Sequence, residues 1–179
     1  MATSILGCIA LAAALLGPLN GAAERSLAAH MVQHMLLIGV AAPLLALSLP
    51  ALKFPPALAF ALHGGAIWFA HAPAMIVWMA ASLTAHMAAH AALFGTALLF
   101  WSSLLRRAGE APLWVLATLI HTGILGALLT FAPRELYAGY SLADQQLAGL
   151  VMWVPGGFLY LAAGLVFARR AIASRAVRT

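Results

Sequence analysis

Seven histidines distinguish this chain, because most of them lie in long apolar stretches with few other ionisable side chains. Two pairs have the spacing of one helical turn: His30 with His34, and His86 with His90. Residues four apart lie on the same face of a helix, so each pair presents two imidazoles side by side. Ionisable side chains within membrane helices are costly and usually mark a functional site. The two pairs therefore predict a shared metal or cofactor site.

Further candidate ligands accompany these pairs. His71, Met75 and Met79 follow at intervals of four residues, which would place all three on one face of a continuous helix. Imidazole and thioether groups together favour copper, Cu(I) in particular, over magnesium, calcium or manganese. Cys8 is the only cysteine, so a thiolate zinc site or an iron–sulfur cluster is excluded. The predicted metal ligands are His30, His34, His71, His86, His90 and Met75.

The other polar and sulfur-bearing residues of these segments are assigned lesser roles. Gln33 is suited to orient a neighbouring imidazole. Isolated methionines in apolar helices more often fill space than bind metal, and packing is the favoured interpretation for Met31, Met35 and Met152. A hydrogen bond to a helix carbonyl is favoured for His63, which precedes two glycines, and His121 receives no assigned role.

Haem b is the main alternative cofactor. Histidines on facing helices hold haem in membrane cytochromes, and His34 with His90 could do the same. Against this, two imidazoles only ~6 Å apart on one helix face suit a compact metal site better than a single axial bond to a porphyrin. A proton pathway is the weaker alternative, because the apolar segments lack a convincing interior carboxylate.

The elements that position these residues must be membrane helices. The chain has 179 residues, of which 65% are hydrophobic and 7% charged, and its mean hydropathy is +1.02. Soluble domains carry roughly a quarter charged residues, and disordered chains are poor in apolar ones, so both classes are excluded. We therefore predict a single all-α domain, a polytopic membrane helix bundle spanning residues 1–179.

Six apolar segments, each near the ~20 residues that cross a bilayer, are expected to be its transmembrane helices. They cover residues 2–19, 26–48, 57–80, 84–105, 112–132 and 144–168. Ser141 and Asp144 have the spacing of a capping box at the start of the last helix. The small residues after the first segment resemble a signal-peptide cleavage site, but no positive charge precedes it, so a retained span is favoured.

Basic residues predict the orientation of the bundle, because cytoplasmic loops are enriched in Lys and Arg. With the C-terminus inside, seven of the nine basic residues are cytoplasmic, and only Arg25 and Arg134 are outside. Both termini are therefore predicted to be cytoplasmic. The net charge of +5 is then a signal of topology rather than of nucleic-acid binding.

Several stretches, taken together, are similar to a known family. They are HMVQHMLL from His30, APLL from Ala42, Trp68–Pro73, the pair His86 and His90 followed by Phe100 and Trp101, TFAP from Thr130, DQQLAG from Asp144 and MWVPGG from Met152. These motifs resemble the polytopic CtaG family of cytochrome c oxidase assembly factors. The resemblance covers most of the chain from His30 to Tyr160.

The resemblance implies a multi-span protein of the bacterial plasma membrane that is needed to make active haem–copper oxidase. No enzymatic activity is expected, because the sequence offers no nucleophile–base pair and no phosphate-binding loop. Copper supply to the oxidase is the usual proposed role of the family. The implied partners are cytochrome c oxidase subunits and a periplasmic or other extracytoplasmic copper donor, beside the lipid bilayer; a homo-oligomer is left open, and no nucleic acid is expected. The family's recurring polar positions correspond to His30, Gln33, His34, His71, His86, His90, Asp144, Gln145 and Gln146.

Two departures from the family pattern affect the expected mechanism. Relatives are usually longer by one span, so a partner subunit is expected to replace it. Many relatives have a glutamate where this chain has Ala89, which leaves charge compensation to Asp144 or to neutral ligation of Cu(I). We expect copper to pass Asp144, Met79 and His86 on its way to the histidines. A metal-free scaffold that holds oxidase subunits together is the remaining alternative.

Overall fold

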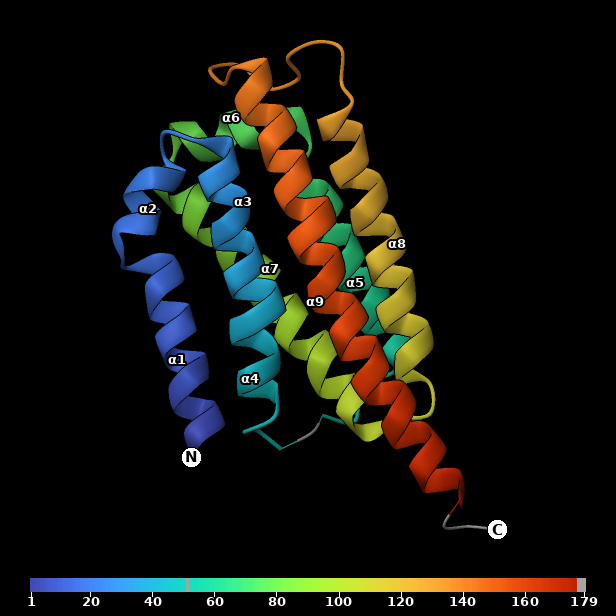
Figure 1. The fold of residues 1–179 in the computed structure, drawn as a ribbon. Coiled ribbons are helices and arrows are strands. Elements are labelled where there is room, and N and C mark those ends of the chain that lie inside the picture. The colour runs from blue at the N-terminus through green and yellow to red at the C-terminus, as the bar shows by residue number, and fades with distance from the viewer. Residues whose placement is uncertain (51, 177–179) are drawn as a thin grey trace.

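The computed structural model describes residues 1–50 and 52–176, with side chains through residue 173. Every regular element in these residues is a helix (Figure 1). Five helical stretches are long and apolar enough to cross a membrane, and a bent helix pair is a candidate for a sixth span. The predicted all-α, multi-pass membrane bundle is therefore confirmed.

The first two spans are interrupted helices. The first consists of α1 (Ala2–Leu15) and α2 (Pro18–Ala23). The two are separated at Gly17, because Pro18 has no N–H to continue the helical hydrogen bonds of α1. The second consists of α3 (Leu27–Met35), a π-helical turn η1 (Leu36–Ala41) and α4 (Ala42–Ala46). A π-helix shifts the backbone hydrogen bonds by one residue, and such turns often lie at functional sites.

The third predicted segment is not one straight helix. It divides into α5 (Pro56–Ala70) and α6 (Pro73–Ala81), which are bent by 72° relative to each other. Pro73 lacks an N–H group and disfavours helical geometry at the residue before it, and Ala72 is accordingly extended. The expected continuous helix over residues 57–80 is therefore wrong, because its helical ladder ends at Ala70.

The remaining spans are α7 (Leu83–Arg106), α8 (Ala111–Thr130) and α9 (Leu142–Ala176). The α8 and α9 backbones approach closely at two glycines. A Cβ atom on Gly149 would lie 2.5 Å from the carbonyl oxygen of Gly126 and 2.6 Å from the Thr130 nitrogen. Small residues at such crossings let membrane helices pack closely without a hydrophobic driving force.

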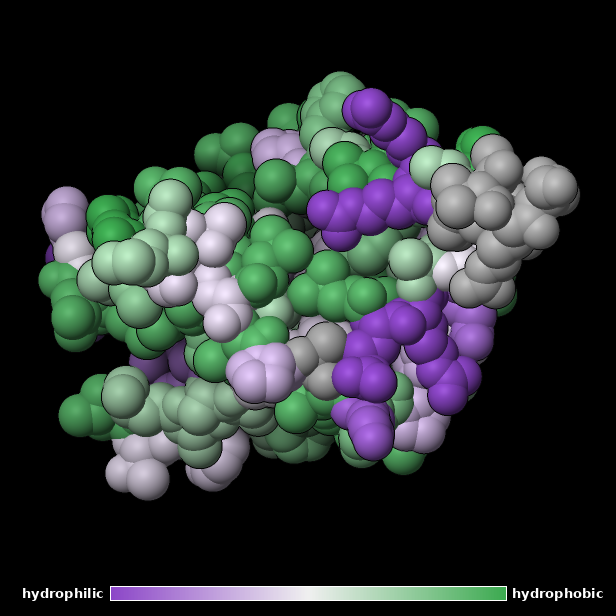
Figure 2. Space-filling model, turned by 90° about the horizontal axis from the view of Figure 1, so that it is seen from below, coloured by the Kyte–Doolittle hydropathy of each residue, from purple (hydrophilic) through white to green (hydrophobic). Residues whose placement is uncertain are grey.

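The two ends of the bundle differ in charge. The N-terminus, the lower part of α9 and the connections α4–α5 and α7–α8 lie at one end, which we call the basic end (Figure 1). Figure 2 shows hydrophilic side chains gathered on this face, and Lys53, Arg106 and Arg107 line a surface pocket there. The opposite end carries the α2–α3 and α8–α9 connections, together with α6.

Candidate metal centre

Three helical elements bring five imidazoles together near the opposite end of the bundle. His30 and His34 come from α3, His86 and His90 from α7, and His71 from the residue that ends α5. Each of the two predicted pairs has ring centroids 4.3 Å apart. Between elements, the centroids of His34 lie 5.1 Å from His90 and 5.4 Å from His71. We call these five residues the histidine cluster.

Three members of the cluster have the arrangement of a metal site. One nitrogen from each of His30, His34 and His90 lies within 4.8 Å of the others. The three side chains are 6%, 1% and 4% exposed. Two nitrogens bound to one ion lie at most ~4.2 Å apart, given metal–nitrogen bonds near 2.1 Å as for zinc. Small side-chain rotations would therefore close this trio site around an ion.

Several ring nitrogens in the trio site are buried without a hydrogen-bond partner. Within the described part of the chain, this holds for Nε2 of His30 and for both nitrogens of His34. Leaving a buried polar atom unpaired costs about 1–3 kcal/mol. A pair of such histidines between membrane helices is suited to bind a ligand, because their lone pairs are not engaged elsewhere.

In two histidines of the cluster, Nδ1 contacts a backbone carbonyl of the same helical turn. Nδ1 of His90 lies 2.9 Å from the carbonyl oxygen of His86, and Nδ1 of His71 lies 2.6 Å from that of Ile67. Metal-binding histidines commonly donate one N–H to a carbonyl, which fixes the ring and leaves the other nitrogen for the metal. In His71 this leaves Nε2 without a proton, whereas Nε2 of His90 also faces an acceptor, Oε1 of Gln33, so the neutral His90 ring donates to only one of its two neighbours.

Gln33 connects the cluster to the first span. Its Nε2 donates to the carbonyl oxygen of Ala14, at 2.9 Å, and to Oδ1 of Asn20, at 3.0 Å. These two acceptors fix the amide so that Oε1 lies 3.1 Å from Nε2 of His90. With the proton on Nε2 the ring donates to this amide and leaves Nδ1 for an ion, which is the arrangement in which Gln33 would orient His90.

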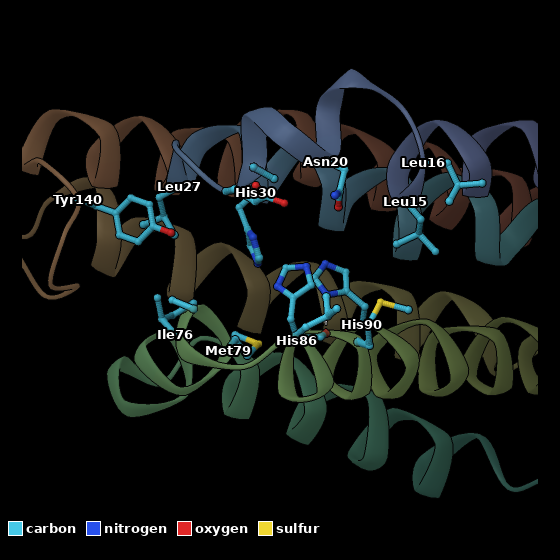
Figure 3. A pocket seen from close by; sticks show the side chains of 15 residues that line it. Leu15, Leu16, Asn20, Leu27, His30, Ile76, Met79, His86, His90 and Tyr140 are labelled. Carbon is cyan, nitrogen blue, oxygen red and sulfur yellow. Dashed lines mark hydrogen bonds between the residues drawn. The ribbon is translucent and has the colours of Figure 1, made fainter.

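A pocket of about 520 Å³ leads to the cluster between the first span and helices α6 and α7. Its lining includes His30, His86 and His90, which point toward one another in Figure 3. His86 is only half-buried and stands at the pocket side of the cluster. Glu24 is the acidic residue in the lining, and Met79 also contributes to it. The pocket thus offers a route by which a cation could reach the trio site.

Asp144 has a different role from the one expected. Ser141 accepts the Asp144 N–H, as the capping-box spacing predicts. The carboxylate, however, reaches α3, where it accepts hydrogen bonds from Ser26 Oγ at 2.8 Å and from the Leu27 N–H at 2.6 Å. It caps the N-terminus of α3, where a negative charge is favourable. Glu24, not Asp144, therefore supplies the carboxylate of the pocket.

The structure places a different methionine next to the histidine cluster from the one that the sequence favoured as a ligand. Met31, assigned to packing, is fully buried, and its Sδ lies 3.1 Å from Nε2 of His71. Met75, predicted as a ligand, lies beyond the bend on α6, is partly exposed and is outside the pocket lining. The expected stripe of His71, Met75 and Met79 required a continuous helix, which the break after Ala70 removes. The signal for Met31 was its position three residues before His34, which places the two side chains on the same face of α3.

His63 and His121 form a separate polar group along α5 and α8. Nδ1 of His63 lies 3.2 Å from the hydroxyl of Thr96, which itself donates to the carbonyl oxygen of Ala92. The partner of His63 is therefore a side chain on α7 and not the backbone carbonyl that we expected. Trp68 donates its indole N–H to Nδ1 of His121, at 3.3 Å.

Fold and site together define a multi-pass helical membrane protein with an imidazole cluster buried between its spans. A family model described as cytochrome c oxidase caa3 assembly factor matches residues 2–55 and 51–174. The chain belongs to this family of assembly factors, which confirms the resemblance and extends it across the first span. No curated protein and no solved structure matches the chain.

Proposed function

We propose that this assembly factor binds copper, as Cu(I), at His30, His34 and His90 and supplies it to a cytochrome c oxidase subunit. The family match establishes oxidase assembly. The observation that carries the copper proposal is the trio of buried imidazoles, in which His34 has no hydrogen-bond partner on either nitrogen. Neutral imidazole suits copper, and a cargo ion needs no catalytic group, so the role is non-enzymatic.

The pocket supports a route for the ion. A cation meets Glu24 and the half-buried His86 in the pocket lining before it reaches His30 and His90. The carboxylate attracts a cation, and His86, whose ring centroid lies 4.3 Å from that of His90, offers an intermediate ligand. The proposal assigns no role to Met75.

The distribution of charge supports an orientation in the bacterial plasma membrane. With the basic end in the cytoplasm, both ends of the chain are cytoplasmic, as the excess of Lys and Arg there favours. The histidine cluster and its pocket then lie near the extracytoplasmic surface. Copper would arrive from an extracytoplasmic donor and leave for an oxidase subunit in the same membrane.

The ring contacts favour copper over haem b. His34 and His90, the expected axial pair, have ring centroids 5.1 Å apart, and both also contact His30. A porphyrin held between two histidines needs a flat slot on all sides of the iron, whereas these rings touch one another. The same closeness suits a single ion with direct imidazole ligands.

The test is metal analysis of the detergent-solubilised protein after anaerobic loading with Cu(I), together with an absorption spectrum. We expect a colourless protein that retains about one copper per chain, as a single imidazole site would hold. His34→Ala should lose the copper, and His121→Ala, which removes a histidine outside the cluster, should retain it. A strong Soret band would establish haem instead, and failure to retain copper would leave the metal-free scaffold.

A further inference from the structure

His71 and Met31 face each other in a way that ordinary packing does not explain. Nε2 of His71 lies 3.1 Å from the sulfur of Met31, and the two side chains are 5% and 0% exposed. Nδ1 of His71 lies 2.6 Å from the carbonyl oxygen of Ile67, so the single proton of the neutral ring is on Nδ1. Nε2 therefore presents a lone pair to a thioether, which also has only lone pairs to offer.

The other protonation states do not relieve this contact. A proton on Nε2 alone would place the lone pair of Nδ1 only 2.6 Å from a carbonyl oxygen. A doubly protonated ring would be a buried cation beside four other imidazoles, which is costly. A soft cation bound to both atoms turns the repulsion into attraction. Bonds of roughly 2.0–2.1 Å to nitrogen and 2.3 Å to sulfur fit a separation of 3.1 Å, at an angle near 90°.

His34 lies between this contact and the trio site. Its ring centroid is 4.3 Å from that of His30 on one side and 5.4 Å from that of His71 on the other. The rings of His71 and His90 are anchored to carbonyls, whereas neither nitrogen of His34 has a partner. The His34 ring is therefore placed to act as a ligand either in the trio site or beside His71 and Met31.

We propose that His34, His71 and Met31 form a second metal site, with two nitrogens and one sulfur, that shares His34 with the trio site. This inference rests on the proposed function. A neutral imidazole has one lone pair, so His34 holds one ion at a time. The ion exchanges His30 and His90 for His71 and Met31 without leaving His34. The thioether makes this second site selective for Cu(I) over harder ions.

X-ray absorption at the copper edge tests the inference on the Cu(I)-loaded, detergent-solubilised full chain. We expect the unmodified protein to show sulfur as well as nitrogen around copper. Met31→Leu should lose the sulfur signal and keep the copper, now held by nitrogen alone. Met35→Leu is the matched control: it lies on the same helix, but its sulfur contacts the Gly156 side of α9, so the sulfur signal should persist.

The outcomes separate this inference from the proposed function. If the unmodified protein holds no copper, the proposed function fails. If it holds copper with nitrogen ligands only, or if Met31→Leu keeps the sulfur signal, the second site is overturned and the trio site stands. His34→Ala provides the second measurement: it should abolish binding at both sites, and retention of a sulfur-bound copper in it would contradict the shared ligand.

Discussion

Trp101 on α7 donates its indole N–H to the carbonyl oxygen of Ile38, at 2.8 Å, inside the π-helical turn of the second span. A π-turn leaves carbonyls outside the regular ladder, and this one is satisfied by a side chain from another helix. Ile38 follows His34 by one turn, and Trp101 follows His90 by three turns. The bond therefore sets the rotation of the second span against α7 beneath the two histidine pairs.

Trp101→Phe should remove that bond while filling most of the same volume. The Ile38 carbonyl would be left buried without its donor, at a cost of about 1–3 kcal/mol. Thermal unfolding in detergent should show a lower midpoint. The control is Trp78→Phe on α6, where the side chain is 50% exposed. Equal midpoints for the two variants would contradict a structural role for the bond.

Gly149→Ala should disrupt the crossing of α8 and α9. The new Cβ would meet backbone atoms of Gly126 and Thr130 at 2.5 and 2.6 Å, which no side-chain rotation relieves. Overpacking of this kind costs about 1–3 kcal/mol, and more where backbone must move. Gly157→Ala, on the same helix, has open space around its Cβ and should leave the unfolding midpoint unchanged. A tolerated Gly149→Ala would show that the helices separate easily.

Asp144→Ala should lower stability without removing copper. The carboxylate caps α3 through the Ser26 hydroxyl and the Leu27 N–H, and loss of such a cap costs about 0.5–2 kcal/mol. Glu135→Ala changes an exposed acid in the connection that precedes α9 and serves as the control. Copper content is the second readout, since loss of copper at an unchanged midpoint would restore the expected charge-compensating role of Asp144.

The contribution of Tyr137 to the stability of the α5–α6 bend should depend on pH in the alkaline range. Its hydroxyl donates to the carbonyl oxygen of His71, at 2.7 Å, and burial raises the pKa of the phenol to about 12 from an ordinary value of 10.0. Because the folded protein holds this proton more tightly, the contribution is complete below pH 10 and declines as the pH rises toward 12. Tyr137→Phe should lessen that decline in a stability–pH profile, and an unchanged profile would contradict the assignment.

Gln33→Leu should weaken copper binding and leave its stoichiometry intact. The amide positions His90 against α1 and α2, and loss of such supporting contacts typically lowers metal affinity by ~10–100-fold. Competition with a Cu(I) chelator measures the change. Gln146→Leu removes an amide that donates to the carbonyl oxygen of Ala132, in the α8–α9 connection, and should have no effect. Equal affinities for the two variants would exclude the positioning role.

The sequence predicted the histidine pairs because helical periodicity is local: a spacing of four fixes which side chains share a face. The structure then brings His30 and His34 against His86 and His90, which the matched apolar segments anticipated. The break at His71 was missed because the hydropathy continues across it, although Pro73, which disfavours helical geometry at Ala72, was its local signal. That break also explains why Met75 was favoured over Met31.

Two further features depend on contacts between distant segments and have no local signature. The Ser141–Asp144 spacing correctly placed the start of α9, but it could not show that the carboxylate bonds α3, 116 to 118 residues away. The hydrogen bond from Trp101 to the carbonyl of Ile38 in the π-turn likewise joins residues 63 apart. Periodicity identifies faces and ends of helices, whereas these pairings arise only when the spans assemble.

The helices that form the walls of the pocket differ in how much of their surface is buried inside the protein. In the first span, 11% of the most apolar window is buried, against 61% in the second, yet Leu15, Asn20 and Ala23 of the first span form one side of the pocket. This wall is held mainly by its own neighbours α3, η1 and α4 and turns most of its surface toward lipid. On this side of the bundle, the first span, which is only slightly buried, separates the histidines from the lipid. A membrane-embedded protein that approaches from this side would meet the first span before it meets the histidines.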